Sequence, residues 1–110
     1  MELTKHKEYS ANGTLLLEGQ YDNYKRKYGL WKEYNSVGSL IIEERYQNGN
    51  RHGEYISYHD NGAIWCRGNY KNGLKDGEFK TYDPDGKLTL TQTFFKNQLF
   101  SEYKRSCNNK

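Results

Sequence analysis

Short runs of aromatic, aliphatic and threonine residues alternate with polar, glycine-containing segments along the whole chain. The runs are 6–9 residues long and rich in Tyr, Ile, Leu, Thr and Trp, a composition typical of β-strands. No segment repeats its apolar residues at the spacing of about 3.6 that an amphipathic helix needs. The pattern therefore predicts an all-β protein with essentially no helix.

The same residue types return every 24 positions, and all eleven glycines take part in this repeat. Each interval holds two expected strands, so the sequence predicts one β-hairpin after another. The glycines and tyrosines in these columns are expected to set turns and to pack, which makes them structural residues. The main columns are Gly29, Gly53 and Gly77; Gly38, Gly62 and Gly86; Tyr34, Tyr58 and Tyr82; and Trp31, Tyr55, Phe79 and Tyr103.

The repeat predicts a single domain over residues 1–106, folded as an elongated, twisted antiparallel β-meander of about nine strands. In the closing unit Asn97 and Ser101 stand where other units have glycine, as expected for the terminal cap of a stacked array. In chain order, the expected parts are a half unit (1–9), full units (10–34, 35–58 and 59–82), a closing partial unit (83–106) and a flexible tail (107–110).

Each unit contains a turn such as Asp83-Pro84-Asp85-Gly86, which has type I turn chemistry followed by a glycine expected at positive φ. The other connection is expected to be longer, from Asn48-Gly49 to Gly53. Regular pairing outward from the first turn fixes a register. It places Tyr34 opposite Leu40, Lys32 opposite Ile42, Trp31 opposite Glu43, Tyr58 opposite Ile64, Ile56 opposite Cys66, Tyr55 opposite Arg67, Tyr82 opposite Leu88 and Phe79 opposite Thr91.

Directly paired residues share a face, so this register divides the side chains between two faces of the sheet. Trp31, Tyr55, Trp65 and Phe79 fall on one face among charged residues and threonines, and we expect that face to be wet. A bulge within a strand would exchange some of these assignments. The other face, expected to be packed, carries Tyr9, Leu15, Leu17, Tyr34, Leu40, Ile42, Tyr58, Ile64, Cys66, Tyr82, Leu88 and Leu90.

The unit Tyr-x-Asn-Gly-x-x-x-Gly-x-aromatic-x-x-Tyr-x-x-x-Gly-x-Leu/Ile resembles the MORN-repeat family, in particular the bacterial variant of antitoxin and immunity proteins. This resemblance implies a β-hairpin repeat that neutralises a cognate toxin by direct binding. The first full unit departs from the pattern, because the segment from Tyr21 to Gly29 is one residue longer and lacks the Asn-Gly pair. The matching positions are Tyr46, Asn48, Gly49, Gly53, Tyr55, Tyr58, Gly62 and Ile64, and then Tyr70, Asn72, Gly73, Gly77, Phe79, Tyr82, Gly86 and Leu88.

Composition limits the classes of function. The 110 residues are 34% hydrophobic and 28% charged, and a chain this short and polar builds a thin core. Cys66 and Cys107 lack any metal-binding spacing, which favours free thiols in a reducing cytoplasm. Asp83-Pro84-Asp85-Gly86 resembles the start of a calcium loop but is not followed by the later oxygen ligands. We therefore expect no catalytic residues, metal or cofactor, and an enzyme is the least favoured interpretation.

Two other partner classes compete with protein binding. Aromatic residues among Lys and Arg could stack single-stranded bases, but 14 acidic residues are interspersed with 17 basic ones and form no basic stripe. Nucleic acid is therefore not expected. Membrane association remains open but is not favoured, because Lys25-Arg26-Lys27 is shorter than the ~4–8 basic residues such binding needs. The alternative function is thus a MORN-type scaffold or a membrane- or phosphoinositide-associated module.

Residues that break the repeat are the best candidates for partner binding, because the fold does not require them. Trp65 stands in a column with Ile41 and Thr89, and Arg67 could form a cation–π contact with Tyr55. The insertion in the first full unit is expected to form an exposed loop. Trp65 could equally just fill the sheet face, and the insertion could simply be tolerated. The predicted partner-binding residues are Tyr24, Lys25, Arg26, Lys27, Tyr28, Tyr55, Trp65 and Arg67.

Overall fold

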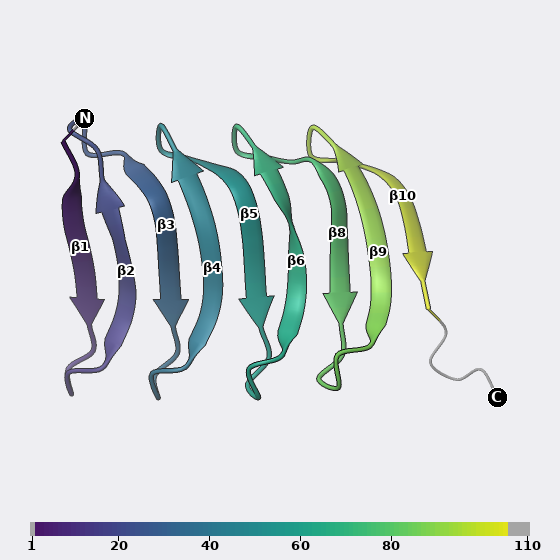
Figure 1. Ribbon diagram of the computed structural model, residues 1–110, viewed down its shortest axis with the longest axis horizontal. Coiled ribbons are helices and arrows are strands. Elements are labelled where there is room, and N and C mark those ends of the chain that lie inside the picture. Colours follow the sequence, from purple (N-terminus) through teal and green to yellow (C-terminus); the bar gives the residue numbers. More distant parts are fainter. Residues whose placement is uncertain (1, 106–110) are drawn as a thin grey trace.

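The computed structural model describes residues 2–105 as one open antiparallel sheet without helices (Figure 1). The all-β meander predicted from the sequence is confirmed, whereas the expected tail, residues 107–110, lies outside the described residues. The strands are β1 (Thr4–Tyr9), β2 (Leu15–Tyr21), β3 (Lys27–Tyr34), β4 (Leu40–Gln47), β5 (Asn50–Tyr58), β6 (Ile64–Lys71), β7 (Leu74–Lys75), β8 (Gly77–Tyr82), β9 (Leu88–Phe95) and β10 (Gln98–Lys104).

The sheet follows the chain in simple order, β1-β2-β3-β4-β5-β6-β8-β9-β10, and the two-residue strand β7 pairs beside β6. Within residues 2–105, β1 and β10 are therefore its two edges, at opposite ends of the long axis (Figure 1). The molecule measures 53 × 35 × 16 Å, which is the shape of a slab one sheet thick. Such a slab can bury side chains only by packing them against neighbours on the same face.

The two kinds of turn differ in where they place residues with positive φ. The turn at Gly86 closes as predicted, because Asp83 N–H donates to Lys87 O at 2.8 Å and Gly86 has a φ of +88°. The second connection is not one long loop. It is a two-residue turn with φ of +52° at Asn48 and +83° at Gly49, the type I′ geometry that Asn-Gly favours. Gly53, with a φ of +109°, then forms a separate bulge within β5.

A one-residue bulge after the first turn shifts the predicted register. Tyr34 pairs with Leu40 as expected, but Glu33 then pairs with Ile42, so Ile41 is an extra residue. The equivalent bulge residues are Leu16, Trp65 and Thr89. The predicted pairs beyond the bulge are therefore wrong by one residue. Lys32 pairs with Glu43 rather than Ile42, Trp31 with Glu44 rather than Glu43, Ile56 with Arg67 rather than Cys66, Tyr55 with Gly68 rather than Arg67, and Phe79 with Gln92 rather than Thr91.

The bulge also reverses the predicted roles of the two faces. Trp31 is only 1% exposed and Phe79 only 4%, so the face expected to be wet is the packed one. We call it the aromatic face, and its ring-bearing residues are His6, Tyr21, Trp31, Tyr46, Tyr55, Tyr70, Phe79 and Phe94. The opposite, charged face carries Glu18, Lys32, Tyr34, Glu43, Tyr58, Arg67 and Lys80.

Glycine makes room for the largest rings of the aromatic face. A Cβ atom at Gly19 would lie 2.1 Å from the Trp31 ring, and one at Gly68 would lie 2.4 Å from the Phe79 ring. Neither glycine has a positive φ, so close approach rather than backbone conformation is what requires glycine here. Trp31 contacts Tyr21 edge to face at 5.2 Å between ring centroids, which extends the packing along the face.

Cations cover these rings from the outside. Lys27 Nζ lies 4.7 Å from the centroid of Trp31 and 4.8 Å from that of Tyr46. Arg51 in the next unit covers Tyr46 and Tyr70, and Lys75 in the third covers Phe79 and Phe94. Cation–π contacts of this kind stabilise by about 0.5–2 kcal/mol each. Within the described residues no second layer of structure covers the aromatic face, and these cations shield its rings instead.

In the middle unit, Glu44 stands at the position that Gly19 and Gly68 hold under the rings of Trp31 and Phe79. Glu44 pairs with Tyr55 across the strands. Glu44 is buried and accepts hydrogen bonds from Arg51 Nε at 2.7 Å and from Tyr46 Oη at 3.1 Å. Burial together with the Glu44 carboxylate raises the pKa of Tyr46 to about 12. A paired carboxylate therefore takes the place of the close glycine–ring contact in this unit.

On the charged face, tyrosine hydroxyls join neighbouring hairpins. Tyr34 Oη donates to Glu18 Oε2 at 2.5 Å, and Tyr58 Oη donates to Glu43 Oε1 at 2.5 Å. Burial and the adjacent carboxylate raise the pKa of each tyrosine to about 12. These tyrosines were predicted to be structural, and their hydroxyl groups provide the link between units.

The closing unit differs because Ser101 stands in a glycine column. In the bulge at Gly53, β5 carries two more residues than β4 between the flanking pairs, whereas in the bulge before Ser101, β10 carries one more than β9. Serine disfavours the positive φ that the wider bulge uses. Pairing in β10 consequently slips by one residue, so Tyr103 pairs with Thr91 and lies on the charged face, 69% exposed.

Candidate functional site

The predicted partner-binding residues fall in three separate places. Tyr55 and Trp65 line the same hollow, near the turn between β5 and β6. Arg67 lies on the charged face. The inserted segment from Tyr24 to Tyr28 spans the turn between β2 and β3 and the first two residues of β3, at the opposite ends of the strands (Figure 1). The structure therefore does not unite them in a single site.

The hollow beside Trp65, here the Trp65 hollow, has a volume of about 410 Å³. Trp65 is the bulge residue of its hairpin and is 52% exposed. The surface of this hollow is mostly apolar. A partner side chain that entered it would leave water and pack against aliphatic and aromatic groups. The lining residues are Ile41, Ile42, Tyr55, Ser57, Tyr58, Asp60, Trp65 and Cys66.

Trp65 is held in position by His59 of its own hairpin, and His59 is fixed against the next hairpin. The Trp65 ring stacks on His59 with centroids 5.4 Å apart and an angle of 24° between planes. His59 Nε2–H in turn donates to Tyr82 O at 2.7 Å, and Asn61 Nδ2 donates to Pro84 O at 2.9 Å from the same turn. Because the ring is already ordered, a partner that contacts it would lose little side-chain entropy on binding.

Arg67 does not form the predicted contact with Tyr55. The bulge places Arg67 opposite Ile56, on the face away from the Tyr55 ring. Its Nη2 atom instead pairs with Glu54 Oε2 at 2.6 Å. The prediction failed because it assumed unbroken alternation from the turn, so the expected cation–π pair is absent among the described residues.

The inserted segment is a compact turn rather than an open loop. Asp22 N–H donates to Arg26 O at 2.9 Å and Lys25 N–H to Asp22 O at 3.0 Å, the pattern seen in the glycine turns. Lys25, with a φ of +62°, takes the position that glycine holds elsewhere. Asp22 is 4% exposed, and its Oδ1 atom accepts the N–H groups of Tyr24 and Arg26. Although burial opposes the effect, these hydrogen bonds and the Arg26 guanidinium lower the pKa of Asp22.

Two of the three basic residues in this turn have structural roles. Arg26 Nε pairs with Asp22 Oδ2 at 2.9 Å, and its guanidinium also covers the Tyr24 ring. Lys27 covers Trp31 on the aromatic face. Lys25 lines a hollow of about 390 Å³ beside Asp22, and among the described contacts it has neither an ion pair nor a ring partner. Tyr28, the last residue of the predicted segment, lies in β3, where it is half-buried and pairs with Gln20. This leaves Lys25 and Tyr24, which is 72% exposed, as the candidates for recognition in this segment.

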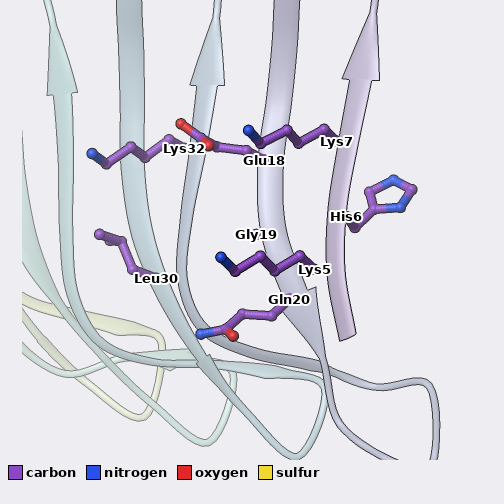
Figure 2. Close-up of a pocket in the computed structure, with 8 residues that line it drawn as sticks. All are labelled: Lys5, His6, Lys7, Glu18, Gly19, Gln20, Leu30 and Lys32. Atoms are coloured by element: carbon purple, nitrogen blue, oxygen red, sulfur yellow. The ribbon is translucent and has the colours of Figure 1, made fainter. Parts of the chain in front are cut away.

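A lysine cluster that the sequence analysis missed lies at the β1 end of the charged face. Lys5, Lys7 and Lys32 line a hollow of about 320 Å³, and Figure 2 shows their side chains extended over the same side of the sheet. Glu18 lies among them, and Lys32 Nζ is 4.0 Å from Glu43. No run of basic residues marks this cluster, because only the pairing of β1, β2 and β3 brings the lysines together.

Residues 2–105 contain no group of three or more His, Cys, Asp and Glu placed to hold a metal ion. None of the elements in this range is a helix able to span a membrane. What the described surface offers is a fixed aromatic anchor beside an apolar hollow, together with a patch of lysines.

More than half of the chain matches the model of one known protein family. Residues 4–23, 51–72 and 75–97 match the MORN repeat variant. The matched segments include Gly19 and Gly68, over which the rings of Trp31 and Phe79 lie. Residues 24–50, with most of the inserted turn, fall between the matches. No curated protein matches the chain.

Proposed function

The chain belongs to the MORN repeat variant family, and from this premise we propose that it is a non-catalytic protein-binding module that contacts its partner through the Trp65 hollow. Repeats of this family mediate protein interactions. The fold suits such a role, because one rigid sheet presents side chains of successive units on a common surface.

The observation that carries this proposal is the position of Trp65. Its bulge column is otherwise occupied by Leu16, Ile41 and Thr89, so the bulge does not require an indole. A tryptophan that is 52% exposed yet stacked on His59 has the properties of an interface anchor. Burying its exposed ring under a partner would contribute about 1 kcal/mol or more.

We further propose that the partner is a cognate toxin, which makes this chain an antitoxin or immunity protein that acts in a bacterial cytoplasm. The support is the resemblance of its repeat unit to the variant form in bacterial antitoxin and immunity proteins. The net charge of +3 does not favour a basic nuclease as the toxin, because an acidic inhibitor would be expected to steer toward such a target.

Co-expression tests this proposal. The product of the gene adjacent to this one is expressed alone, and growth arrest identifies it as a toxin. Wild-type chain should restore growth, and the Trp65→Ala variant should fail or bind with faster dissociation. Thr89→Ala changes the same bulge column in the next unit and should rescue like the wild type. Rescue by Trp65→Ala with unchanged dissociation would remove the Trp65 hollow from the interface.

The second candidate is a scaffold module that associates with anionic membranes, and the lysine cluster gives it limited support, because three lysines around Glu18 are fewer than the ~4–8 basic residues that such binding needs. Lys5, Lys7 and Lys32 could contact lipid phosphates, since their side chains extend over the same side of the sheet (Figure 2). Co-sedimentation with phosphoinositide vesicles at physiological salt tests this. Binding that is lost in a Lys5→Ser, Lys7→Ser variant but kept in Trp65→Ala would favour this function over toxin neutralisation.

A further inference from the structure

The two long edges of the slab, where the strands end in turns, differ in charge. The turns that join β2 to β3, β4 to β5, β6 to β7 and β9 to β10 all lie at one of these edges (Figure 1). The acidic residues there are Asp22, which pairs with Arg26, and half-buried Asp76. The turns at the opposite edge carry Asp60, Asp83 and Asp85 with Lys87. Basic residues in or beside the first set of turns form what we call the basic rim: Lys25, Lys27, Arg51, Lys71, Lys75 and Lys96.

Three cations of the basic rim occupy one column of the repeat. Lys27, Arg51 and Lys75 each pair across the strands with a tyrosine of the aromatic face. Their strands alternate with the strands of these tyrosines, so neighbouring cations of the column lie about 10 Å apart. In the closing unit Leu99 holds the same position. The column is therefore a row of cations along the long axis, and within residues 2–105 it ends at an apolar residue.

These cations are available to an anion outside the sheet. Lys27 and Lys75 lie over rings, and within residues 2–105 neither forms an ion pair. Arg51 donates through Nε to Glu44, yet its side chain is still 47% exposed. The terminal nitrogens of the guanidinium remain as donors for a second carboxylate. Since no second layer of structure covers this face, one extended anion can reach all three cations.

The spacing of the row selects among extended anions. In a polyproline II helix every third residue returns to the same side of the chain after about 9.3 Å, which matches the row. In a β-strand the third residue along points to the opposite side. Half-buried Tyr46 and Tyr70 lie beside the row, and aromatic surfaces of this kind accept the prolines of such a helix. The two rings are packed edge to face against Trp31 and Phe79 and covered by cations, so they offer no open platform for stacked bases.

We infer that the basic rim binds an acidic, proline-rich segment of the partner protein, held as a polyproline II helix with a carboxylate at every third residue. The inference rests on the proposed protein-binding function and adds a second contact surface to it. Successive carboxylates of the segment meet Lys27, Arg51 and Lys75, and the other lysines of the rim attract it from solution. The Trp65 hollow lies near the opposite long edge, so one partner would be held at both edges of the slab.

A labelled synthetic peptide of four Glu-Pro-Pro triplets tests the spacing by fluorescence anisotropy. It should bind more tightly than a peptide of the same composition whose glutamates are consecutive, and added salt should weaken its binding. Equal affinity for these two peptides overturns the inference. Tighter binding of single-stranded DNA of equal charge, or of a helical peptide with glutamate at every seventh position, also overturns it.

Paired variants test the location. Lys27→Met, Lys75→Met removes two charges of the row while an unbranched side chain still covers the rings. Affinity for the triplet peptide should fall about tenfold, as expected for two exposed ion pairs. The matched control is Lys80→Met, Lys87→Met, which removes the same charge from the charged face and the opposite turns and should bind nearly as the wild type. Equal weakening in both variants, with unchanged circular dichroism spectra, contradicts the proposed location.

A further variant keeps the test independent of the rings. Lys25→Ser, Lys71→Ser, Lys96→Ser changes exposed side chains of the rim and should slow association of the peptide. An unchanged association rate overturns the role of the rim. Co-sedimentation with phosphoinositide vesicles that is lost in Lys27→Met, Lys75→Met would assign the row to a membrane and overturn the inference too.

The Trp65→Ala variant separates this test from that of the proposed function, because it should bind the triplet peptide like the wild type. If the peptide does not bind while Trp65→Ala still abolishes growth rescue, the inference about the rim fails and the proposed function stands. If the peptide binds and Trp65→Ala rescues growth, the Trp65 hollow is removed from the interface and the rim remains.

Discussion

The indole of Trp31 lies directly on Gly19, so closely that a methyl group at position 19 would come within 2.1 Å of the ring. This contact predicts that a side chain at position 19 lowers the stability of the fold. Gly19→Ala should destabilise the protein by about 2 kcal/mol or more, since ring and strand must separate. Chemical denaturation followed by circular dichroism measures this change.

The same pair also allows a double-mutant cycle. Trp31→Ala alone removes the most buried ring, but with Ala at position 19 it relieves the clash, so the double variant should lose less stability than the sum of the two single penalties. Gly62→Ala is the control, because Gly62 has a φ of +88° and a methyl group there would meet no atom within 4 Å, so its penalty comes from backbone conformation. If Gly19→Ala and Trp31→Ala proved additive, the close contact would not limit stability.

Lys25→Gly should stabilise the protein. Lys25 has a φ of +62° in the position that Gly13, Gly38, Gly62 and Gly86 hold in the other turns of this type. Glycine removes the steric cost of that conformation, partly offset by its greater freedom in the unfolded chain, for a net gain of up to about 1 kcal/mol. Thermal unfolding measures it. Ser36→Gly, at a turn position without positive φ, should instead destabilise slightly.

Serine substitutions should separate the three basic residues of the inserted turn. Lys27→Ser removes the cation over Trp31 and Tyr46 and should cost about 1 kcal/mol. Lys25→Ser should leave the melting temperature nearly unchanged, because no ion pair is lost. Equal melting temperatures for the two variants would show that the Lys27 contact contributes nothing to the fold.

Alkaline pH should weaken the links between hairpins. Burial and the carboxylates of Glu18 and Glu43 raise the pKa values of Tyr34 and Tyr58 to about 12, from an ordinary value of 10.0. Because the folded protein holds these protons more tightly than the unfolded chain, their stabilising effect is complete below pH 10 and is lost as the pH rises from 10 to 12.

The measurement is the denaturant midpoint at several pH values between neutrality and pH 12. A Tyr34→Phe, Tyr58→Phe variant should lose less stability over this range than the wild type, although half-buried Tyr46, whose pKa is also raised, leaves some dependence. Tyr9→Phe, at a tyrosine that is 57% exposed, should behave as the wild type. Parallel stability curves for all three proteins would contradict the assignment to the tyrosine–carboxylate links.

The turn at Gly86 was predicted because its chemistry is local, and its positive φ follows from a few adjacent residues. The Asn48-Gly49 pair carries equally local turn chemistry, but the prediction extended this connection to Gly53 and so missed both the two-residue turn and the separate bulge in β5. The bulge at Ile41 and Trp65 was not predicted, since its residues share no composition that marks an extra position in a strand. A bulge shifts every later residue to the other face, so this one omission reversed the expected packed and wet faces.

The candidate site was predictable only in part for the same reason. Trp65 was found as an exception to its column, and it does line a hollow with Tyr55. Arg67 was placed on the wrong face by the missed bulge. The role of Arg26 depends on the carboxylate of buried Asp22, four residues away across a turn whose glycine position is filled by lysine. The lysine cluster depends on contacts between three strands, which no local pattern reveals.

The simple strand order also determines how the protein would respond to mechanical force. The two edge strands of the sheet lie at opposite ends of the long axis (Figure 1). Each strand between them, apart from the short β7, is hydrogen-bonded to the strands that precede and follow it in the order β1-β2-β3-β4-β5-β6-β8-β9-β10. Tension between these ends acts across the strands, so it loads one row of hydrogen bonds at a time instead of shearing all rows together. The sheet should therefore unzip at low force in successive steps, and the chain could lengthen under load while its inner hairpins stay folded.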